Sequence, residues 1–374
     1  MNMSHFASEP YEYLAKYYEK RDNKEFQNII SKEITEADKR GYGLDLLFIK
    51  DTIEYIRNEN RLVLAGGNGA YSVYSFLLGI TERTDPFYHG YYPEMLYGLK
   101  WERRPFIPLT ISPDFEGDIV RYLENTYGKE DVEYDGHEYC ISVRGEGGST
   151  VQSLSLIRDY TVSFVERLNK DEYATRDNLG KNERSFPGRI GYDCTVTDDL
   201  QTVLNSGELP EVISDYISLA DGVDEAISEN TKEFFQSVYD NTFYGLIKVM
   251  AAIKGSNIWN LGDNAADYGL FTRDDVYNYV MKKYLLEKEN AYSVMEYVRR
   301  GMKLKEEDAL RLLRAGASDR FIRILNEIRY MKSERGLFPY VQVVLWMASE
   351  KKKNRNHYLK VFDEVLRLKE SAGI

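Results

Sequence analysis

Apolar and charged residues recur with helical spacing over residues 9–60. This pattern predicts two or three amphipathic helices, with a break at Gly41-Tyr42-Gly43. Residues 112–128 carry the signals of a helix at both ends, because Ser112 fits the N-cap, Pro113 the first turn and Gly128 the stop. From residue 231 onward we expect an almost entirely helical chain. The predicted helices there are 231–253, 272–286, 288–301, 305–315, 318–332, 339–350 and 356–371.

Strands are predicted mainly in the first half. Arg61-Leu62-Val63-Leu64 predicts a strand that enters a glycine turn, and 70–80 a following helix. A further strand is expected at 138–143, then a glycine-rich turn and a helix over 151–169. The pattern of 170–230 is weak, polar and acidic, apart from a possible strand at 189–196. The predicted fold class is α/β (α+β) and predominantly helical, with a small mixed sheet and an all-helical second part.

Composition narrows the possible functions. The chain has 374 residues and a net charge of −12, which argues against a generally cationic nucleic-acid binder but leaves room for a local basic groove. Two cysteines and four histidines without zinc-site spacing argue against a structural zinc site. The chain shows no signal peptide and no apolar run of membrane-spanning length. We therefore expect a cytoplasmic protein without a membrane partner.

A glycine loop is the first candidate for a binding site. In AGGNGAYSVYSFLLGIT (65–81), three glycines precede an apolar stretch, and such a loop can turn its N–H groups toward a phosphate. The candidate nucleotide-binding residues are Gly66, Gly67, Asn68, Gly69 and Ser72.

This loop and its surroundings resemble bacterial C-family replicative DNA polymerases, the DNA polymerase III alpha subunits, and their PolC type most. The family has a Gly-Arg-Gly-Ser-type loop and a helix ending Leu-Gly-Ile-Thr, which is similar to Leu78-Gly79-Ile80-Thr81 here. Its Pro-Asp-Ile-Asp motif matches Pro105-Phe106-Ile107-Pro108. Its helix ending Tyr/Phe-Gly-x-Asp-x-Val matches Tyr127-Gly128-Lys129-Glu130-Asp131-Val132.

The second half carries further similar segments in the family's order. They are GSNIWNLGDNA (255–265), TRDDVYNYV (272–280), AYSVMEYVRRGMKL (291–304) and IRILNEIRYM (322–331). The resemblance spans roughly 9–150 and 235–350 and implies a truncated relative, limited to the palm and fingers. It implies a palm of the polymerase beta nucleotidyltransferase type over 1–169, a variable insertion or palm remainder over 170–230, and a helical fingers-like domain over 231–374 that ends in a basic helix.

The chain departs from the family where the chemistry would occur. Nucleotidyl transfer uses two metal ions held by closely spaced carboxylates. The resemblance places Phe106 and Pro108 at the two metal-binding aspartates, and Gly66 at the loop arginine. Glu334 and Gly336 stand where the family has a lysine and a histidine. We therefore expect no catalytic residues, no cofactor and weak or absent nucleotide binding.

Several basic residues are candidates for nucleic-acid binding. They are Arg103, Arg104, Arg299, Arg300, Lys303, Lys351, Lys352, Lys353 and Arg355. The acidic region 198–230 could compete with DNA for these residues, or could bind protein.

Three hypotheses follow. The first is a catalytically inactive polymerase relative that binds DNA or a replication-related protein. The second is an active nucleotidyltransferase whose rebuilt Mg²⁺ site uses Asp114, Glu116 or Asp118. The third is a nucleotide sensor that keeps the Gly66–Gly69 loop without chemistry. The oligomeric state stays open.

Overall fold

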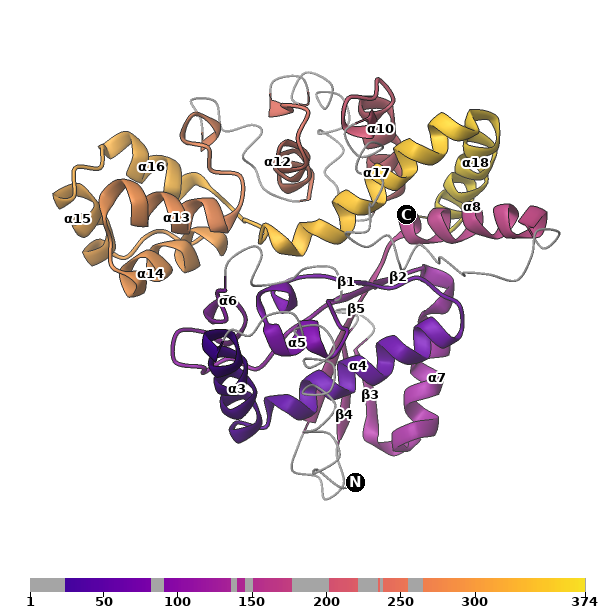
Figure 1. Ribbon diagram of the computed structural model, residues 1–374, viewed down its shortest axis with the longest axis horizontal. Helices are drawn as coiled ribbons and strands as arrows, with labels where there is room; N and C mark the ends of the chain where they lie inside the picture. The colour runs from indigo at the N-terminus through magenta and orange to yellow at the C-terminus, as the bar shows by residue number, and fades with distance from the viewer. Residues whose placement is uncertain are drawn as a thin grey trace. The chain divides into compact units, whose positions relative to one another are not determined.

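The computed structural model describes residues 24–81, 91–135, 140–144, 151–176, 202–220, 235, 238–254 and 265–373 (Figure 1). The chain divides into two compact units, Met1–Thr195 and Val196–Ile374. The three-part division expected from the sequence stays a prediction.

The first unit is built on a mixed sheet of five strands in the order β1-β2-β5-β4-β3. The strands are β1 (Leu64–Ala65), β2 (Leu109–Ile111), β3 (Val132–Asp135), β4 (Cys140–Arg144) and β5 (Val151–Arg158). β2 and β5 pair in parallel, with Leu109 opposite Leu156, whereas the other pairs are antiparallel. β2 and β5 therefore end at the same edge of the sheet.

The α-helices described in this unit are α3 (Lys24–Lys39), α4 (Tyr42–Asn58), α5 (Val73–Leu77), α6 (Glu94–Tyr97), α7 (Glu116–Tyr127) and α8 (Tyr160–Arg176). Of these, α4, α7 and α8 pack against strands of the sheet. Ile141 and Leu154 lie opposite each other on neighbouring strands and are fully buried. They belong to one hydrophobic core with Leu46 of α4 and Ile119 of α7. The predicted break between the first two helices is confirmed at Gly41, whose φ of 77° favours glycine.

The helix predicted over 151–169 is wrong in its first half. Residues Val151–Arg158 form β5, and α8 begins only at Tyr160. Leu154 and Leu156 alternate with Ser153 and Ser155, and this period of two buries one side of a strand. Asp159 then starts the helix by accepting hydrogen bonds from the backbone N–H and the hydroxyl of Thr161 at 2.9 and 2.5 Å.

Two other predictions in this unit have different outcomes. The helix predicted over 70–80 is shorter, because a 3₁₀ turn (Gly69–Tyr71) precedes α5 and Gly79 takes a φ of 72° just beyond it. The helix predicted over 112–128 is confirmed, as a 3₁₀ turn (Pro113–Phe115) followed by α7 and stopped at Gly128.

The described part of the second unit is helical. Its main helices are α10 (Leu209–Leu219), α12 (Phe243–Ile253), α13 (Arg273–Tyr284), α14 (Lys288–Arg299), α15 (Glu306–Arg314), α16 (Asp319–Glu327), α17 (Phe338–Lys353) and α18 (Arg355–Ser371). α10 packs against α17 and α18, and α13 against α14 (Figure 1). Thr272 and Asp275 form a reciprocal capping box at the start of α13.

Two of the predicted helices here are too long. Residues 239–242 are not helical, and α12 begins after Thr242, whose hydroxyl accepts the Gly245 N–H at 2.9 Å. α16 ends at Glu327, because the segment that follows pairs its backbone with other elements: Met331 N–H donates to the Arg299 carbonyl. Residues 9–23 of the predicted helical region and the strand predicted at 189–196 lie outside the described residues. The predicted fold class, predominantly helical with a small mixed sheet, is confirmed.

Candidate functional site

The glycine loop lies directly against residues 106–108. The Gly66 N–H donates to the Pro108 carbonyl at 2.9 Å, next to the pairing of β1 with β2. Gly67 has a φ of 71°, and a Cβ there would lie 2.9 Å from Cδ of Pro108. A Cβ on Gly69 would meet Ile107 at 2.8 Å. Close packing against this segment therefore requires the two glycines, independently of any ligand.

Ser72 is fully buried and bonded within the protein. Its hydroxyl donates to Oε1 of Glu33 at 2.6 Å and lies 3.1 Å from the Tyr97 hydroxyl. The same oxygen accepts the Ser75 N–H at 3.0 Å and so caps α5. This loop residue, predicted to bind nucleotide, serves as a helix cap in the structure.

A carboxylate of the chain itself receives the N–H groups at the start of α5. Glu33 accepts the Val73 N–H at 3.1 Å and the Tyr74 N–H at 3.4 Å, and the Tyr97 hydroxyl also donates to it. Burial raises the pKa of Glu33, although the hydrogen bonds from Ser72 and its neighbours act in the opposite direction. The N–H groups of Val73 and Tyr74, which follow the glycine loop, are thus already bonded within the protein.

Phe106 and Pro108, which the resemblance places at the family's metal-binding aspartates, provide no ligand oxygen from their side chains. Phe106 is 56% exposed, while the half-buried Pro108 contacts the glycine loop. A phenyl ring and a pyrrolidine ring have no lone pair for a hard cation such as Mg²⁺.

The three acids proposed for a rebuilt metal site are each paired with an arginine. Asp114 Oδ1 lies 2.6 Å from Nη2 of Arg61, and Glu116 lies 3.7 Å from Arg158. Asp118 pairs with Arg121 on the same helix. Burial alone would raise the pKa of Asp114, but hydrogen bonds from Ser112 and Arg61 outweigh it and lower the pKa. Among the described residues, no group of three His, Cys, Asp or Glu side chains is arranged to hold a metal ion.

Sequence reasoning missed two charged residues in this unit. Arg61 joins Asp114 to Glu166 of α8, at 3.0 Å from the latter, and its guanidinium lies 4.6 Å from the centre of the Phe115 ring. Glu33 had a signal in the sequence, because it follows Ile30 by three residues and so lies on the apolar face of its helix. Arg61 had none, since its partners are about 50 and 100 residues further along the chain.

Most of the predicted nucleic-acid-binding cations are paired with carboxylates. Arg104 lies 3.1 Å from Asp45, whose pKa burial raises to about 6 in spite of this arginine. Arg299 and Arg300 both bond to Glu296, at 2.5 and 2.9 Å. In contrast, Lys303 is exposed and has no ion-pair partner among the described residues.

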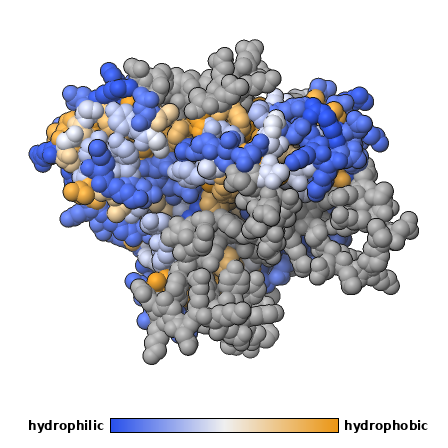
Figure 2. All heavy atoms as spheres, turned by 45° about the horizontal axis from the view of Figure 1, so that its top comes forward, coloured by the Kyte–Doolittle hydropathy of each residue, from blue (hydrophilic) through white to orange (hydrophobic). Residues whose placement is uncertain are grey.

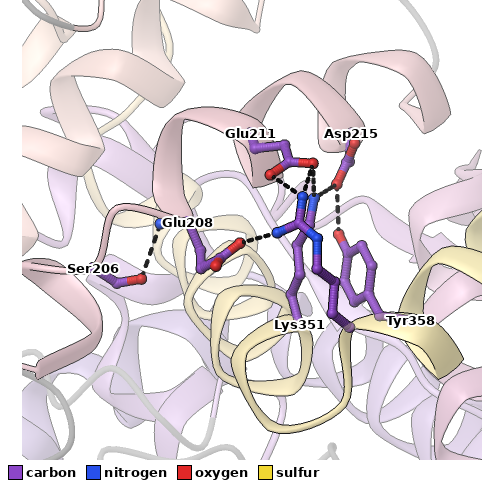
Figure 3. Close-up of polar contacts among 7 residues, drawn as sticks. Ser206, Glu208, Glu211, Asp215, Lys351 and Tyr358 are labelled. Carbon is purple, nitrogen blue, oxygen red and sulfur yellow. Dashed lines mark hydrogen bonds and ion pairs between the residues drawn. The ribbon is translucent and has the colours of Figure 1, made fainter.

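Lys351, the first residue of the basic run 351–355, faces the acidic helix α10 (Figure 3). The side chain of Lys351 is fully buried, with its Nζ 2.7 Å from Asp215 and 3.0 Å from Glu211. The Tyr358 hydroxyl also donates to Asp215, at 3.1 Å.

The neighbouring cations of this run differ from one another. Arg355 bonds to Glu208 and Glu211 at 2.9 and 2.8 Å, and Lys353 pairs with Glu350 at 2.6 Å. Lys352 is exposed without an ion-pair partner in the described part of the chain. The idea that the acidic region could compete for this patch thus has a structural counterpart in Glu208 and Glu211.

Glu334 and Gly336, which the resemblance places at the family's lysine and histidine, lie in an acidic and largely buried environment. Burial, together with Asp274 and Asp275, raises the pKa of Glu334 to about 7. The Glu334 N–H donates to Asp274 at 2.8 Å, and Gly336 is buried. This part of the second unit would repel a phosphate when Glu334 is ionised.

Comparison with known proteins supports the resemblance for the first part of the chain. Residues 4–144 match the family model of the bacterial DNA polymerase III alpha NTPase domain. This range includes the glycine loop and residues 106–108, so this part of the chain is DNA polymerase III alpha-like. No curated protein matches the chain. No helix in the described ranges is long and apolar enough to cross a membrane.

Proposed function

We propose that the chain is a catalytically inactive relative of the DNA polymerase III alpha core, which acts by binding a replication-related protein and performs no nucleotidyl transfer. The observation that carries this proposal is the contact between the glycine loop and residues 106–108. Pro108 stands at a metal-binding position of the family and packs against Gly67. This close packing supports the interpretation that the family's metal site has been lost in this chain.

Catalysis by another route has little support in the geometry. Nucleotidyl transfer needs two metal ions held by adjacent carboxylates that face the nucleotide. Asp114, Glu116 and Asp118 are instead compensated by three different arginines. Moving a metal ion into this region would require these ion pairs to break.

Nucleotide binding is likewise disfavoured by the contacts of the loop. Ser72 and the N–H groups of Val73 and Tyr74 bond to Glu33. An incoming phosphate would have to displace a buried carboxylate, or approach it closely, and either carries a large electrostatic penalty.

A protein partner is favoured over DNA by the pairing of the predicted cations. Affinity for DNA arises largely from cations that are free to replace counterions on the phosphates. Six of the nine predicted cations are already paired with carboxylates: Arg104, Arg299, Arg300, Lys351, Lys353 and Arg355. The net charge of −12 adds a general repulsion.

Primer extension tests the loss of catalysis. A labelled primer annealed to a longer template is incubated with the protein, all four deoxynucleotides and either Mg²⁺ or Mn²⁺, beside an active DNA polymerase. We expect no extension with either metal. Extension that disappears in the triple variant Asp114→Asn, Glu116→Gln, Asp118→Asn would establish the rebuilt metal site instead.

Two binding measurements separate the remaining alternatives. We expect no shift of the melting temperature with any deoxynucleoside triphosphate, and a shift that is lost in Gly67→Ala would favour the nucleotide sensor. We also expect labelled single- and double-stranded oligonucleotides to bind only at low salt. Binding at physiological salt that weakens in the double variant Lys303→Glu, Lys352→Glu would favour DNA as the partner.

A further inference from the structure

Leu285 exposes its side chain and has a left-handed backbone, although its N–H caps α13 by donating to the Val280 carbonyl. It follows the last residue of α13 and is 84% exposed, the largest exposed fraction among the large hydrophobic residues that the structure describes. Its φ of 54° and ψ of 34° are left-handed. Glycine and asparagine are favoured at such helix ends, whereas a leucine there is strained.

Tyr284, the residue before Leu285, belongs to an aromatic cluster. Tyr268, Tyr279 and Tyr284 surround the buried ring of Phe321, with ring centres 5.1, 5.3 and 5.2 Å from it. All three tyrosines are partly exposed. Tyrosine on a firm apolar base is a common anchor in protein interfaces, since it buries a large area with little loss of side-chain freedom.

Positive charge borders the same end of α13. Lys282 and Lys283 are exposed and have no ion-pair partner among the described residues. Both interact favourably with the carboxyl end of the helix, so their presence alone needs no partner. The nearest acidic residues further along the chain are Glu287 and Glu289, at the start of α14. The positive charge of Lys282 and Lys283 therefore lies at the end of α13, before Leu285.

We propose that Leu285, Lys282, Lys283 and the three tyrosines form a docking surface for an acidic polypeptide segment with apolar side chains. We call these six residues the α13 surface. The apolar side chains of the segment pack against Leu285 and the tyrosine rings, and its carboxylates pair with the two lysines. Hydrophobic residues among hydrophilic ones are visible at the left of Figure 2, where α13 to α16 lie in Figure 1. This inference rests on the proposed binding function and specifies the chemistry of the partner.

The test uses the full chain and a fluorescein-labelled peptide of 14 residues, in which Asp and Glu flank Leu and Phe at helical spacing. Fluorescence anisotropy measures its affinity. We expect saturable binding that weakens about tenfold in Leu285→Asn and in the double variant Lys282→Glu, Lys283→Glu. Lys352→Glu removes an exposed lysine on another helix and should leave the affinity unchanged. A peptide with Ser in place of Leu and Phe should not bind.

Folding does not confound this test, because asparagine suits the left-handed backbone at residue 285. Leu285→Asn should melt at the same temperature as the wild type or higher. Undetectable peptide binding, or equal affinity for the wild type and both variants, would overturn the proposal. The proposal would also be overturned if Leu285→Asn abolished only dimer formation, or only binding to an oligothymidylate, and left peptide binding unchanged. These results leave the proposed loss of catalysis untouched, since primer extension decides that separately.

Discussion

Oγ of Ser72 lies 2.6 Å from Oε1 of Glu33, and both side chains are fully buried. This bond ties the start of α5 to α3, and the N–H groups of Val73 and Tyr74 share the same carboxylate. A loop that resembles a phosphate-binding element is therefore held by an anion that belongs to the chain. The contact makes the loop part of the core of the first unit.

Glu33→Ala should destabilise the protein strongly. It leaves the hydroxyl of Tyr97 and the N–H of Val73 without their acceptor, and each unsatisfied buried donor costs about 1–3 kcal/mol. We expect the free energy of unfolding in urea to fall by at least about 2 kcal/mol. Glu54→Ala, at an exposed end of an ion pair on α4, should change it by less than about 0.5 kcal/mol. Equal urea midpoints for the two variants would contradict the role of Glu33.

Gly67→Ala should be more harmful than Gly41→Ala. Both glycines have a positive φ, 71° and 77°, so both variants are strained by about 1 kcal/mol. A Cβ at residue 67 would also lie 2.9 Å from Pro108, whereas nothing lies within 4 Å at residue 41. We expect Gly67→Ala to lose a further 1 kcal/mol or so in urea unfolding.

A double-mutant cycle with Pro108→Ala isolates this contact. If the extra loss comes from the proline ring, Gly67→Ala should be milder in the Pro108→Ala background. An unchanged penalty would mean that backbone strain alone explains the effect.

The helix boundaries that the sequence predicts best have their determinants nearby. Gly128 stops α7 and Gly41 separates α3 from α4, because each supplies a backbone conformation that few other residues adopt. The sequence predicts a helix where β5 forms. The alternating serines and leucines of β5 form a strand because β2 and β4 pair with it, and these strands come from elsewhere in the chain. Tertiary pairing, and not local preference, decides such a segment.

The candidate site could be predicted only in part for the same reason. The sequence shows that residues 106 and 108 are Phe106 and Pro108, but it does not show the contact of Pro108 with Gly67. Lys351 belongs to a run of lysines that is typical of a solvated helix end, yet its side chain is buried and bonds to Asp215. Asp215 lies 136 residues before Lys351 in the chain, so no local sequence pattern predicts this contact.

Lys351→Ala should destabilise the second unit, because the half-buried carboxylate of Asp215 then loses its cation. Breaking a buried ion pair by removing one partner costs about 3–5 kcal/mol, and we expect the lower end because the Tyr358 hydroxyl still donates to Asp215. Lys352→Ala, at the neighbouring exposed position, should change the free energy of unfolding by less than about 0.5 kcal/mol.

The double variant Lys351→Met, Asp215→Leu distinguishes the ion pair from packing. Apolar residues of similar volume can replace a buried pair at little cost, so the double variant should be more stable than Lys351→Ala. Strictly additive losses in urea unfolding would contradict a direct interaction between the two residues.

Ionisation of Glu334 should weaken the fold as the pH rises. Burial and the charges of Asp274 and Asp275 raise its pKa from 4.5 to about 7, so the folded state binds this proton more tightly than the unfolded state. The stabilising effect is complete below pH 4.5, decreases between pH 4.5 and 7, and is absent above pH 7. A difference of about 2.5 in pKa corresponds to about 3 kcal/mol at most.

The variant Glu334→Gln tests this effect, because glutamine does not ionise. Its free energy of unfolding relative to the wild type should rise by up to about 3 kcal/mol between pH 5 and pH 8. Urea unfolding at the two pH values measures this difference, and Glu364→Gln, at an exposed position on α18, controls for the removal of one negative charge. A difference between Glu334→Gln and the wild type that stays constant from pH 5 to pH 8 would show that burial and the neighbouring acids do not raise the pKa of Glu334 in the folded state.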